Sequence, residues 1–173
     1  GALGSAAYPR AIEKRIQLLK EFGVNHIRTS HNPYSEDFMD LCDEYGILVV
    51  DELYDKWLDQ YCGGRAPWAL LWQKDIPEWI KRDRNHPSIV IWGLLNETWN
   101  TPAHEAAIAL LPTLREWDDT RLVLLSSGKF VKDFTLGCLA NPGVREWEHQ
   151  WGDDGTGKGE EEGQRGDYHI YPR

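Results

Sequence analysis

Residues 82–97 read RDRNHPSIVIWGLLNE, and this stretch indicates the fold class of the chain. Its centre, 88–92, is a short apolar run rich in β-branched residues, and the turn sequence Asn85-His86-Pro87 precedes it. An apolar run without alternation is typical of a parallel strand that is covered on both faces. We therefore expect 88–92 to be a buried strand of a parallel sheet.

Helical and strand patterns alternate along the rest of the chain, as they do in α/β proteins with a parallel sheet. The helices are expected over 9–22, 36–45, 68–84 and 103–117. The strands are expected over 24–29, 47–50, 88–92, 121–126 and 168–171. Five strands are too few to close an eight-stranded barrel, so the sequence predicts an open or incomplete parallel sheet.

The first helix is indicated by apolar residues that repeat at helical spacing, which are Ile12, Ile16, Leu19 and Phe22. Gly23 then stands where a C-terminal cap belongs. The second helix has Ser35 as its expected N-cap, Gly46 as its end and Cys42 on its buried side.

Two prolines fall inside predicted helices. Proline removes a backbone N–H and clashes with the preceding turn. We therefore expect Pro77 to kink or restart the helix over 68–84, and Pro112 to interrupt the helix over 103–117.

Asn96-Glu97 follows the strand at 88–92 and is the first candidate for a chemical role. In a β/α barrel, side chains just beyond the carboxyl end of a strand point into the site. A carboxylic acid beside an amide that can bond a sugar hydroxyl is what general acid/base attack on a glycosidic bond requires. The alternatives are a glutamate stabilised by a helix N-terminus and an asparagine in a turn.

Three segments resemble motifs of glycoside hydrolase family 2, which includes many β-galactosidases, β-glucuronidases and β-mannosidases. The acid/base signature of the family is matched by residues 83–97, DRNHPSIVIWGLLNE. The two other motifs are matched by residues 27–33, IRTSHNP, and residues 41–52, LCDEYGILVVDE. The resemblance extends from about residue 11 to residue 171, with a poorly matched stretch between 130 and 166.

The resemblance implies a (β/α)8 TIM barrel that is incomplete in this chain. With about five strand–helix units, the barrel would lack its first strand, before Gly1, and its last two units, after Arg173. A typical barrel has ~250 residues, whereas this chain has 173. We expect one partial barrel domain over 1–173, with a glycine-rich and charged loop at about 141–166.

The resemblance also implies roles for individual residues. Glu97 would be the general acid/base, which protonates the leaving oxygen and then activates water. Asn96 would bond the 2-hydroxyl of the sugar, and His31 would contact another hydroxyl. Arg28 would lie in the barrel mouth, pair with an acid and help to keep the nucleophile ionised. Without the resemblance, His31 would be interpreted as a hydrogen-bonded structural histidine.

Asp51-Glu52 ends the strand of the third motif. Neighbouring residues on a strand point to opposite faces, so the two carboxylates are not expected to act as a pair. We expect Glu52 to line the substrate site. Asp55 and Trp57 in the following loop are expected to shape the sugar pocket, and the pattern Asp-Glu-x-x-Asp-x-Trp resembles β-galactosidase-like members of the family.

Two aromatic segments near the C-terminus are further binding candidates. Tyr171 aligns with a tyrosine that the family uses to hydrogen-bond the nucleophile, and His169 lies on the same face of the strand. Both residues could instead pack in the core. Trp147 and Trp151 precede the glycine-rich loop, where they could wall a substrate cleft or pin the loop to the barrel.

The nucleophile of a retaining mechanism would be a second carboxylate ~5–5.5 Å from the first. By resemblance it is a glutamate at the end of the seventh strand, beyond Arg173. The parent protein is therefore expected to be a retaining β-glycosidase, most like a β-galactosidase, and the isolated chain to be inactive. The alternatives are a non-catalytic carbohydrate-binding or degenerate barrel, and an inverting hydrolase that pairs Glu97 with Glu52 at ~6.5–9.5 Å.

The composition bounds the partners. The net charge is −9, from 28 acidic and 19 basic residues without a basic block, which argues against nucleic acid and anionic membranes as partners. The six histidines show no close ligand spacing, and the three cysteines form no Cys-x-x-Cys pair. We expect a carbohydrate substrate, with neither a metal nor another cofactor.

The rest of the organisation follows from the family resemblance or stays open. Accessory β-sandwich domains are expected in the parent chain, and an oligomer is left open. The compartment is also left open, since the N-terminus shows no signal-peptide pattern and looks like an internal cut.

Overall fold

Helices and strands alternate through the part of the chain that the computed structural model describes, which is residues 7–55, 68–96 and 102–127. The eight elements, in chain order, are α1 (Pro9–Glu21), β1 (His26–Arg28), α2 (Glu36–Tyr45), β2 (Leu48–Glu52), α3 (Trp68–Asp83), β3 (Ile89–Asn96), α4 (Pro102–Trp117) and β4 (Leu122–Ser127). This alternation confirms the α/β fold class. The expected strand at 168–171 and the loop at about 141–166 lie outside the described residues.

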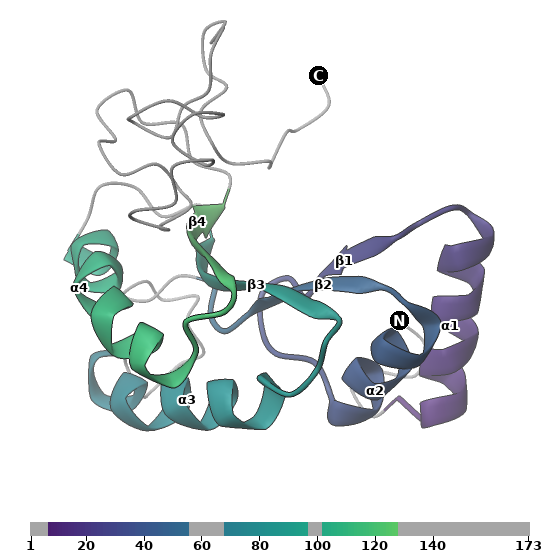
Figure 1. Ribbon diagram of the computed structural model, residues 1–173, viewed down its shortest axis with the longest axis horizontal. Helices are drawn as coiled ribbons and strands as arrows, with labels where there is room; N and C mark the ends of the chain where they lie inside the picture. Colours follow the sequence, from purple (N-terminus) through teal and green to yellow (C-terminus); the bar gives the residue numbers. More distant parts are fainter. Residues whose placement is uncertain (1–6, 56–67, 97–101, 128–173) are drawn as a thin grey trace, which may run out of the picture.

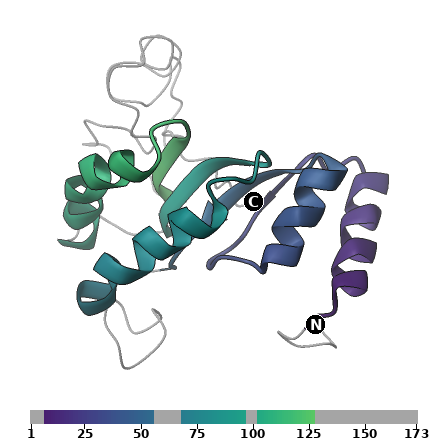
Figure 2. The ribbon, with the colours of Figure 1, turned by 60° about the horizontal axis from the view of Figure 1, so that its bottom comes forward.

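The four described strands form one parallel sheet in the order β1-β2-β3-β4. Figures 1 and 2 show the helices lined up along one side of this sheet. Because every strand runs in the same direction, the carboxyl ends of β1, β2 and β3 meet at one edge. This edge is where polar side chains that follow the strands are brought together.

The two faces of the sheet have different surroundings. Val49, Trp92 and Val123 belong to the large hydrophobic cluster that includes the buried residues of the helices. Val50 and Leu124 form a second, smaller cluster on the alternate positions. In the register of the sheet, Val50 pairs with Ile91, and these alternate positions therefore form the face away from the helices.

Helix α1 buries two of the apolar residues that repeat at helical spacing. Ile12 and Ile16 are buried, whereas Phe22 is 85% exposed. The helix ends at Glu21, and Phe22 is its C-cap, where the backbone leaves the helical path. Helical spacing no longer places a side chain once the helix has ended. Gly23 follows with a positive φ of 80°, as a residue at the end of a helix often has.

Helix α2 has the expected ends. Ser35 is the N-cap, although its side chain makes no cap hydrogen bond, and Gly46 ends the helix in the left-handed conformation with φ 65°. Cys42 is fully buried, which confirms its interpretation as a small core residue. Burial, and secondly the charge of Asp43, raise the pKa of the Cys42 thiol to about 12.

Neither proline breaks its helix. Helix α3 continues through Pro77, and α4 continues through Pro112, so the expected interruption of α4 is wrong. Side chains adjacent to Pro77, such as Ile76 and Trp79, are buried in the core. Tertiary packing of this kind outweighs the hydrogen bond that a proline removes. Among the described residues, no helix has the length and apolar character needed to span a membrane.

Candidate active site

The carboxyl ends of three adjacent strands bring Arg28, Glu52 and Asn96 into one cluster. Arg28 is the last residue of β1, Glu52 the last of β2 and Asn96 the last of β3. The Arg28 guanidinium donates from Nε to Glu52 Oε1, and from Nη2 to Asn96 Oδ1 at 2.8 Å. The expected pairing of Arg28 with an acid is confirmed, and that acid is Glu52.

Glu52 is held on both carboxylate oxygens. Its side chain is 1% exposed, Arg28 donates to Oε1, and Oε2 lies 2.9 Å from Nδ1 of His31. An ionised carboxylate only accepts, so His31 donates from Nδ1. The other ring nitrogen, Nε2, is then the His31 atom that can meet a ligand. Glu52 therefore fixes the orientation of the His31 ring, because its carboxylate accepts from one ring nitrogen and directs the other away from itself.

Asn96 is fixed at both ends of its amide. Its Oδ1 accepts from Arg28, while its Nδ2 donates to Asp55 Oδ1 at 2.8 Å. The backbone N–H of Asn96 also donates to the carbonyl of Asp55 at 2.8 Å. These contacts fix both the backbone and the side-chain amide of Asn96 at the end of β3. Asp55, which the sequence placed near the sugar pocket, is thus part of the same cluster.

Because Gly93 has no side chain, the Glu52 side chain has room beside it. The two residues are partners in the register of β2 and β3. A Cβ added to Gly93 would lie 2.6 Å from Glu52 Cγ, far inside the usual separation of carbon atoms. The strand expected over 88–92 in fact continues, as β3, to Asn96. An isolated glycine in a strand often marks such a close approach, so the signal was present in the sequence.

Asp51 lies on the opposite face from Glu52, as the alternation of a strand predicts. It is fully buried, accepts from Thr29 Oγ1 at 3.1 Å, and accepts from Trp79 Nε1 at 2.5 Å. The Glu52 backbone N–H donates to the same Thr29 hydroxyl at 2.9 Å. No local pattern in the sequence indicates these roles of Thr29 and Trp79, because both residues are more than twenty positions from Asp51 along the chain.

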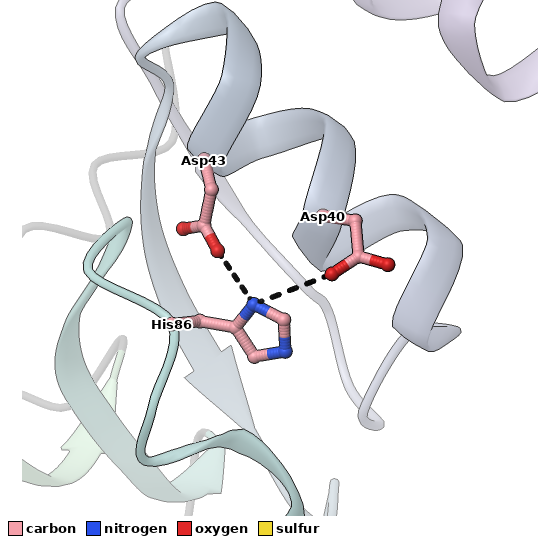
Figure 3. A group of neighbouring side chains, drawn as sticks. All are labelled: Asp40, Asp43 and His86. Atoms are coloured by element: carbon pink, nitrogen blue, oxygen red, sulfur yellow. Dashed lines mark hydrogen bonds and ion pairs between the residues drawn. The ribbon is translucent and has the colours of Figure 1, made fainter.

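A second polar cluster joins α2 to the loop before β3 and is drawn in Figure 3. His86 Nδ1 lies 2.6 Å from Asp43 Oδ2 and 3.9 Å from Asp40 Oδ1, and Asp43 Oδ1 accepts from the backbone N–H of Ser88 at 2.8 Å. Two ligands on one ion at ~2.0–2.2 Å each would stay about 3 Å apart. The 2.6 Å separation is instead that of a hydrogen bond. This cluster therefore ties α2 to the start of β3.

Several candidate residues lie outside the described part of the chain, so their contacts stay predictions. They are Glu97, Trp57, Trp147, Trp151, His169 and Tyr171. Of the described candidates, the structure brings Arg28, His31, Glu52 and Asn96 together.

Comparison with known proteins assigns the family. Residues 3–153 match the family described as "Glycosyl hydrolases family 2, TIM barrel domain". The chain belongs to glycosyl hydrolase family 2. The four-stranded parallel sheet with its helices is thus part of a family 2 TIM barrel, which confirms the resemblance seen in the sequence.

Relatives with two different activities are similar to this family 2 chain. A putative β-glucuronidase of Formosa agariphila is 40% identical over 132 residues, covering 74% of this chain and 12% of that protein. A β-galactosidase of Bacteroides ovatus is 38% identical over 128 residues, covering 73% and 13%. The chain therefore spans about an eighth of the length of these relatives.

Solved structures show the same fold. A family 2 member from Bacteroides cellulosilyticus superposes with a TM-score of 0.67 at 38% identity, covering 77% of this chain and 18% of that chain. A family 2 β-galacturonidase from Eisenbergiella tayi, bound to galacturonate, superposes with a TM-score of 0.66 at 34% identity. The match covers 78% of this chain and 24% of that chain.

Proposed function

We propose that the protein containing this chain hydrolyses terminal β-O-glycosidic bonds with retention of configuration. Glu97 would act as general acid/base, and a glutamate beyond Arg173 would act as nucleophile. The observation that carries this proposal is the cluster of Arg28, Glu52 and Asn96 at the carboxyl ends of three adjacent strands, together with the family assignment. Sites of β/α barrels are built at this edge.

The cluster supports a sugar-binding role for Asn96 and His31. Arg28 and Asp55 hold the Asn96 amide, and Glu52 holds the His31 ring. Polar groups whose positions are fixed in advance stabilise a transition state without a further cost of ordering. Glu97, the next residue after Asn96, would then donate its proton to the leaving oxygen and later take one from water.

Glu52 is better suited to anchoring than to chemistry. A general base must reach a water molecule, but Glu52 is 1% exposed and its two oxygens meet Arg28 and His31. This arrangement favours the retaining mechanism over the inverting alternative that pairs Glu97 with Glu52.

A neutral sugar suits the described part of the site better than a uronic acid. Among the described residues, the guanidinium of the cluster, Arg28, is engaged with Glu52 and Asn96. The same cluster contains two carboxyl groups, those of Glu52 and Asp55, which would repel the carboxylate of a uronic acid. We therefore propose a β-galactosidase-like activity, although the similar proteins include β-glucuronidases as well as β-galactosidases.

The proposed activity belongs to a protein that is longer than this chain. Relatives of much greater length are consistent with accessory domains around the barrel, and the expected nucleophile lies beyond Arg173. The isolated chain of 173 residues is expected to be inactive.

The first test is to sequence the coding region roughly 100 residues past Arg173, which is what a barrel of typical size needs. A strand pattern that ends in a glutamate, followed by an eighth strand, supports the retaining mechanism. A stop codon, or a strand without that glutamate, contradicts it and leaves a carbohydrate-binding or degenerate barrel.

The second test is kinetic. In the complete protein, Glu97→Gln should slow hydrolysis of β-galactosides with poor leaving groups by 10²–10⁴-fold, the usual contribution of general acid/base catalysis. Substrates with good leaving groups need no proton, so their glycosylation should be slowed much less. Equal losses on both kinds of substrate would contradict the role of Glu97. A larger kcat/KM for a β-glucuronide than for a β-galactoside would contradict the proposed sugar preference.

A further inference from the structure

Thr29, the residue after β1, is a buried polar residue behind the candidate active site. It is fully buried, and its backbone N–H donates to the carbonyl of Val50 at 3.0 Å, so the pairing of β1 with β2 continues one residue past Arg28. In a parallel pair, a residue that donates in this way normally also accepts, on its own carbonyl, from the N–H two residues further along the partner strand. The expected donor to the Thr29 carbonyl is therefore the backbone N–H of Glu52.

The Thr29 side chain takes the place of that carbonyl. The Glu52 N–H donates to the Thr29 hydroxyl at 2.9 Å, whereas the Thr29 carbonyl accepts from the backbone N–H of Asn32 at 2.9 Å. The second hydrogen bond closes a four-residue turn, 29–32, which contains His31. The hydroxyl thus completes the ladder with β2 and leaves the carbonyl available for the turn.

The hydroxyl is itself held by an anchored acceptor. It donates to Asp51 Oδ1 at 3.1 Å, and Asp51 Oδ2 accepts from Trp79 Nε1 of α3 at 2.5 Å. The Trp79 ring packs edge-on against Trp92 of β3, with 4.9 Å between the ring centroids. A hydroxyl has one proton to donate and lone pairs with which to accept, so a threonine can serve Asp51 and the Glu52 N–H at the same time.

The ladder and the turn meet at the Glu52 carboxylate. The Thr29 hydroxyl accepts from the Glu52 backbone, and Glu52 Oε2 accepts from Nδ1 of His31, in the turn, at 2.9 Å. Arg28, the neighbour of Thr29 on the other face of the strand, donates to Oε1. Both partners of the buried carboxylate therefore lie on either side of Thr29 in the chain, and the Thr29 hydroxyl holds the backbone from which the carboxylate extends.

We propose that Thr29 is a positioning residue for sugar binding. Its hydroxyl replaces its own carbonyl in the ladder with β2, so that the chain can turn and place the His31 ring on Glu52. The sugar-binding part of this inference rests on the proposed glycosidase function, whereas the hydrogen-bonding role of the hydroxyl does not. Without the hydroxyl, the N–H groups of Glu52 and Asn32 must share one carbonyl. Asp51 also loses a donor, and a buried polar group without its partner is costly.

Two substitutions separate the hydroxyl from the side-chain volume, and both are made in the complete protein. Thr29→Val has the same shape but can neither donate nor accept, whereas Thr29→Ser keeps the hydroxyl and loses only a methyl group. Thr120→Val is the matched control. The Thr120 hydroxyl also donates to an aspartate, Asp118, at 2.5 Å, but it precedes β4 and so lies at the opposite edge of the sheet from the candidate active site.

Hydrogen exchange of single backbone amides tests the role of the hydroxyl without any assay of activity. In Thr29→Val, exchange of the Glu52 or the Asn32 amide should be about tenfold faster than in the wild type, the effect of losing one hydrogen bond. The Leu53 amide is the internal reference, because it donates to the Gly93 carbonyl of β3 at 3.1 Å. A general loss of stability would speed all three amides equally. Equal acceleration of all three, or no acceleration of Glu52 and Asn32, overturns the inference.

Kinetics test the positioning role. Thr29→Val should raise KM for a β-galactoside about tenfold, the effect of one lost hydrogen bond. Its kcat should stay close to that of the wild type, because a misplaced His31 weakens sugar binding while Glu97 is unchanged. Thr29→Ser should recover most of the loss in KM. A KM of Thr29→Val no higher than that of Thr120→Val, or a Thr29→Ser variant as impaired as Thr29→Val, overturns the positioning role.

Two kinds of failure remain distinguishable. If Thr29→Val does not fold, Thr29→Cys takes its place. A thiol is a weak donor and a weak acceptor, so Thr29→Cys should raise KM and speed the Glu52 or Asn32 amide more than Thr29→Ser does. Equal effects of these two variants overturn the inference. If the complete wild type hydrolyses no β-glycoside, the proposed function fails, while amide exchange still tests the role of the hydroxyl.

Discussion

Replacement of Gly93 by alanine tests whether the Glu52 side chain is held as firmly as its contacts indicate. The new Cβ would lie 2.6 Å from Glu52 Cγ and 3.4 Å from Oε1, while the next atom, the Asp51 carbonyl oxygen, is 3.5 Å away. Carbon atoms prefer separations of about 3.5–4.0 Å, so Glu52 must move by close to 1 Å. Its buried contacts with Arg28 and His31 oppose that movement.

The expected cost of Gly93→Ala is about 1–3 kcal/mol of unfolding free energy, the usual effect of overpacking a core. The φ of Gly93 is not in the left-handed region, so alanine adds no backbone strain. Glu52→Ala removes the Cγ atom that causes the clash. In that background Gly93→Ala should therefore cost almost nothing, or stabilise by up to about 1 kcal/mol through the reduced freedom of the unfolded chain.

The assay is a double-mutant cycle in urea unfolding, with the wild type, both single variants and the double variant of the complete protein. Any effect of leaving Arg28 without Glu52 is common to Glu52→Ala and the double variant, and so cancels. We expect a coupling energy of about 1–3 kcal/mol between the two positions. If Gly93→Ala costs the same in both backgrounds, Glu52 is not what the glycine accommodates, and the reasoning about the rigid cluster is refuted.

Three further predictions concern single residues. Burial raises the pKa of Asp118, but hydrogen bonds from Thr120, Arg121 and Trp92 outweigh it and lower that pKa to about 2. Asp118 therefore stabilises the fold above about pH 4 and loses this effect between pH 4 and pH 2. Asp118→Asn should lower the unfolding free energy at pH 7 by about 2 kcal/mol and make that free energy less dependent on acid pH. If the unfolding free energies of the variant and the wild type fall in parallel with acid, the prediction is wrong. Arg28→Met should cost about 3–5 kcal/mol because it leaves the Glu52 charge buried, and Arg28→Lys should cost less; equal unfolding midpoints for the two variants would argue against the ion pair. Cys42 should resist alkylation by iodoacetamide at pH 8 until urea is added, because it is buried and its pKa is about 12. Peptide mapping that finds Cys42 alkylated in the native protein would show that α2 opens.

The fold class could be predicted from the sequence because the strand and helix patterns are local. The continuous apolar runs at 47–50 and 88–92 indicated buried parallel strands, and β2 and β3 were found there, although β2 begins and ends one or two residues later. The ends of elements were harder to predict. Leu48 is 47% exposed at the start of β2, and β3 continues past Gly93 because a side chain of the neighbouring strand fills the space beside it.

The error in helix α4 has a physical cause. Pro112 was expected to interrupt a helix that in fact continues to Trp117. A local propensity competed there with contacts made by distant residues, and only the structure shows which of the two determines the outcome.

The positions of the candidate site residues could be predicted from the sequence, but the contacts between them could not. The motifs located Arg28, His31, Glu52 and Asn96 at strand ends, and the parallel sheet brings them together as expected. The partners could not be read from the sequence. Arg28 and Asn96 are 68 residues apart in the chain, and no local pattern indicates that one amide joins the guanidinium to the loop at Asp55.

Asp51 and Glu52 show how far a sequence pattern can go toward chemistry. Alternation along a strand correctly puts the two neighbouring carboxyl groups on opposite faces. Their surroundings depend on what each face contains. Glu52 pairs with the Arg28 guanidinium, whereas Asp51 is buried among the helices and accepts from Trp79 and Thr29, and burial raises its pKa to about 7 against the effect of those hydrogen bonds. Two adjacent acids can therefore support different parts of one site: Glu52 holds the side chains that would contact a sugar, and Asp51, through Thr29, holds the backbone from which they extend.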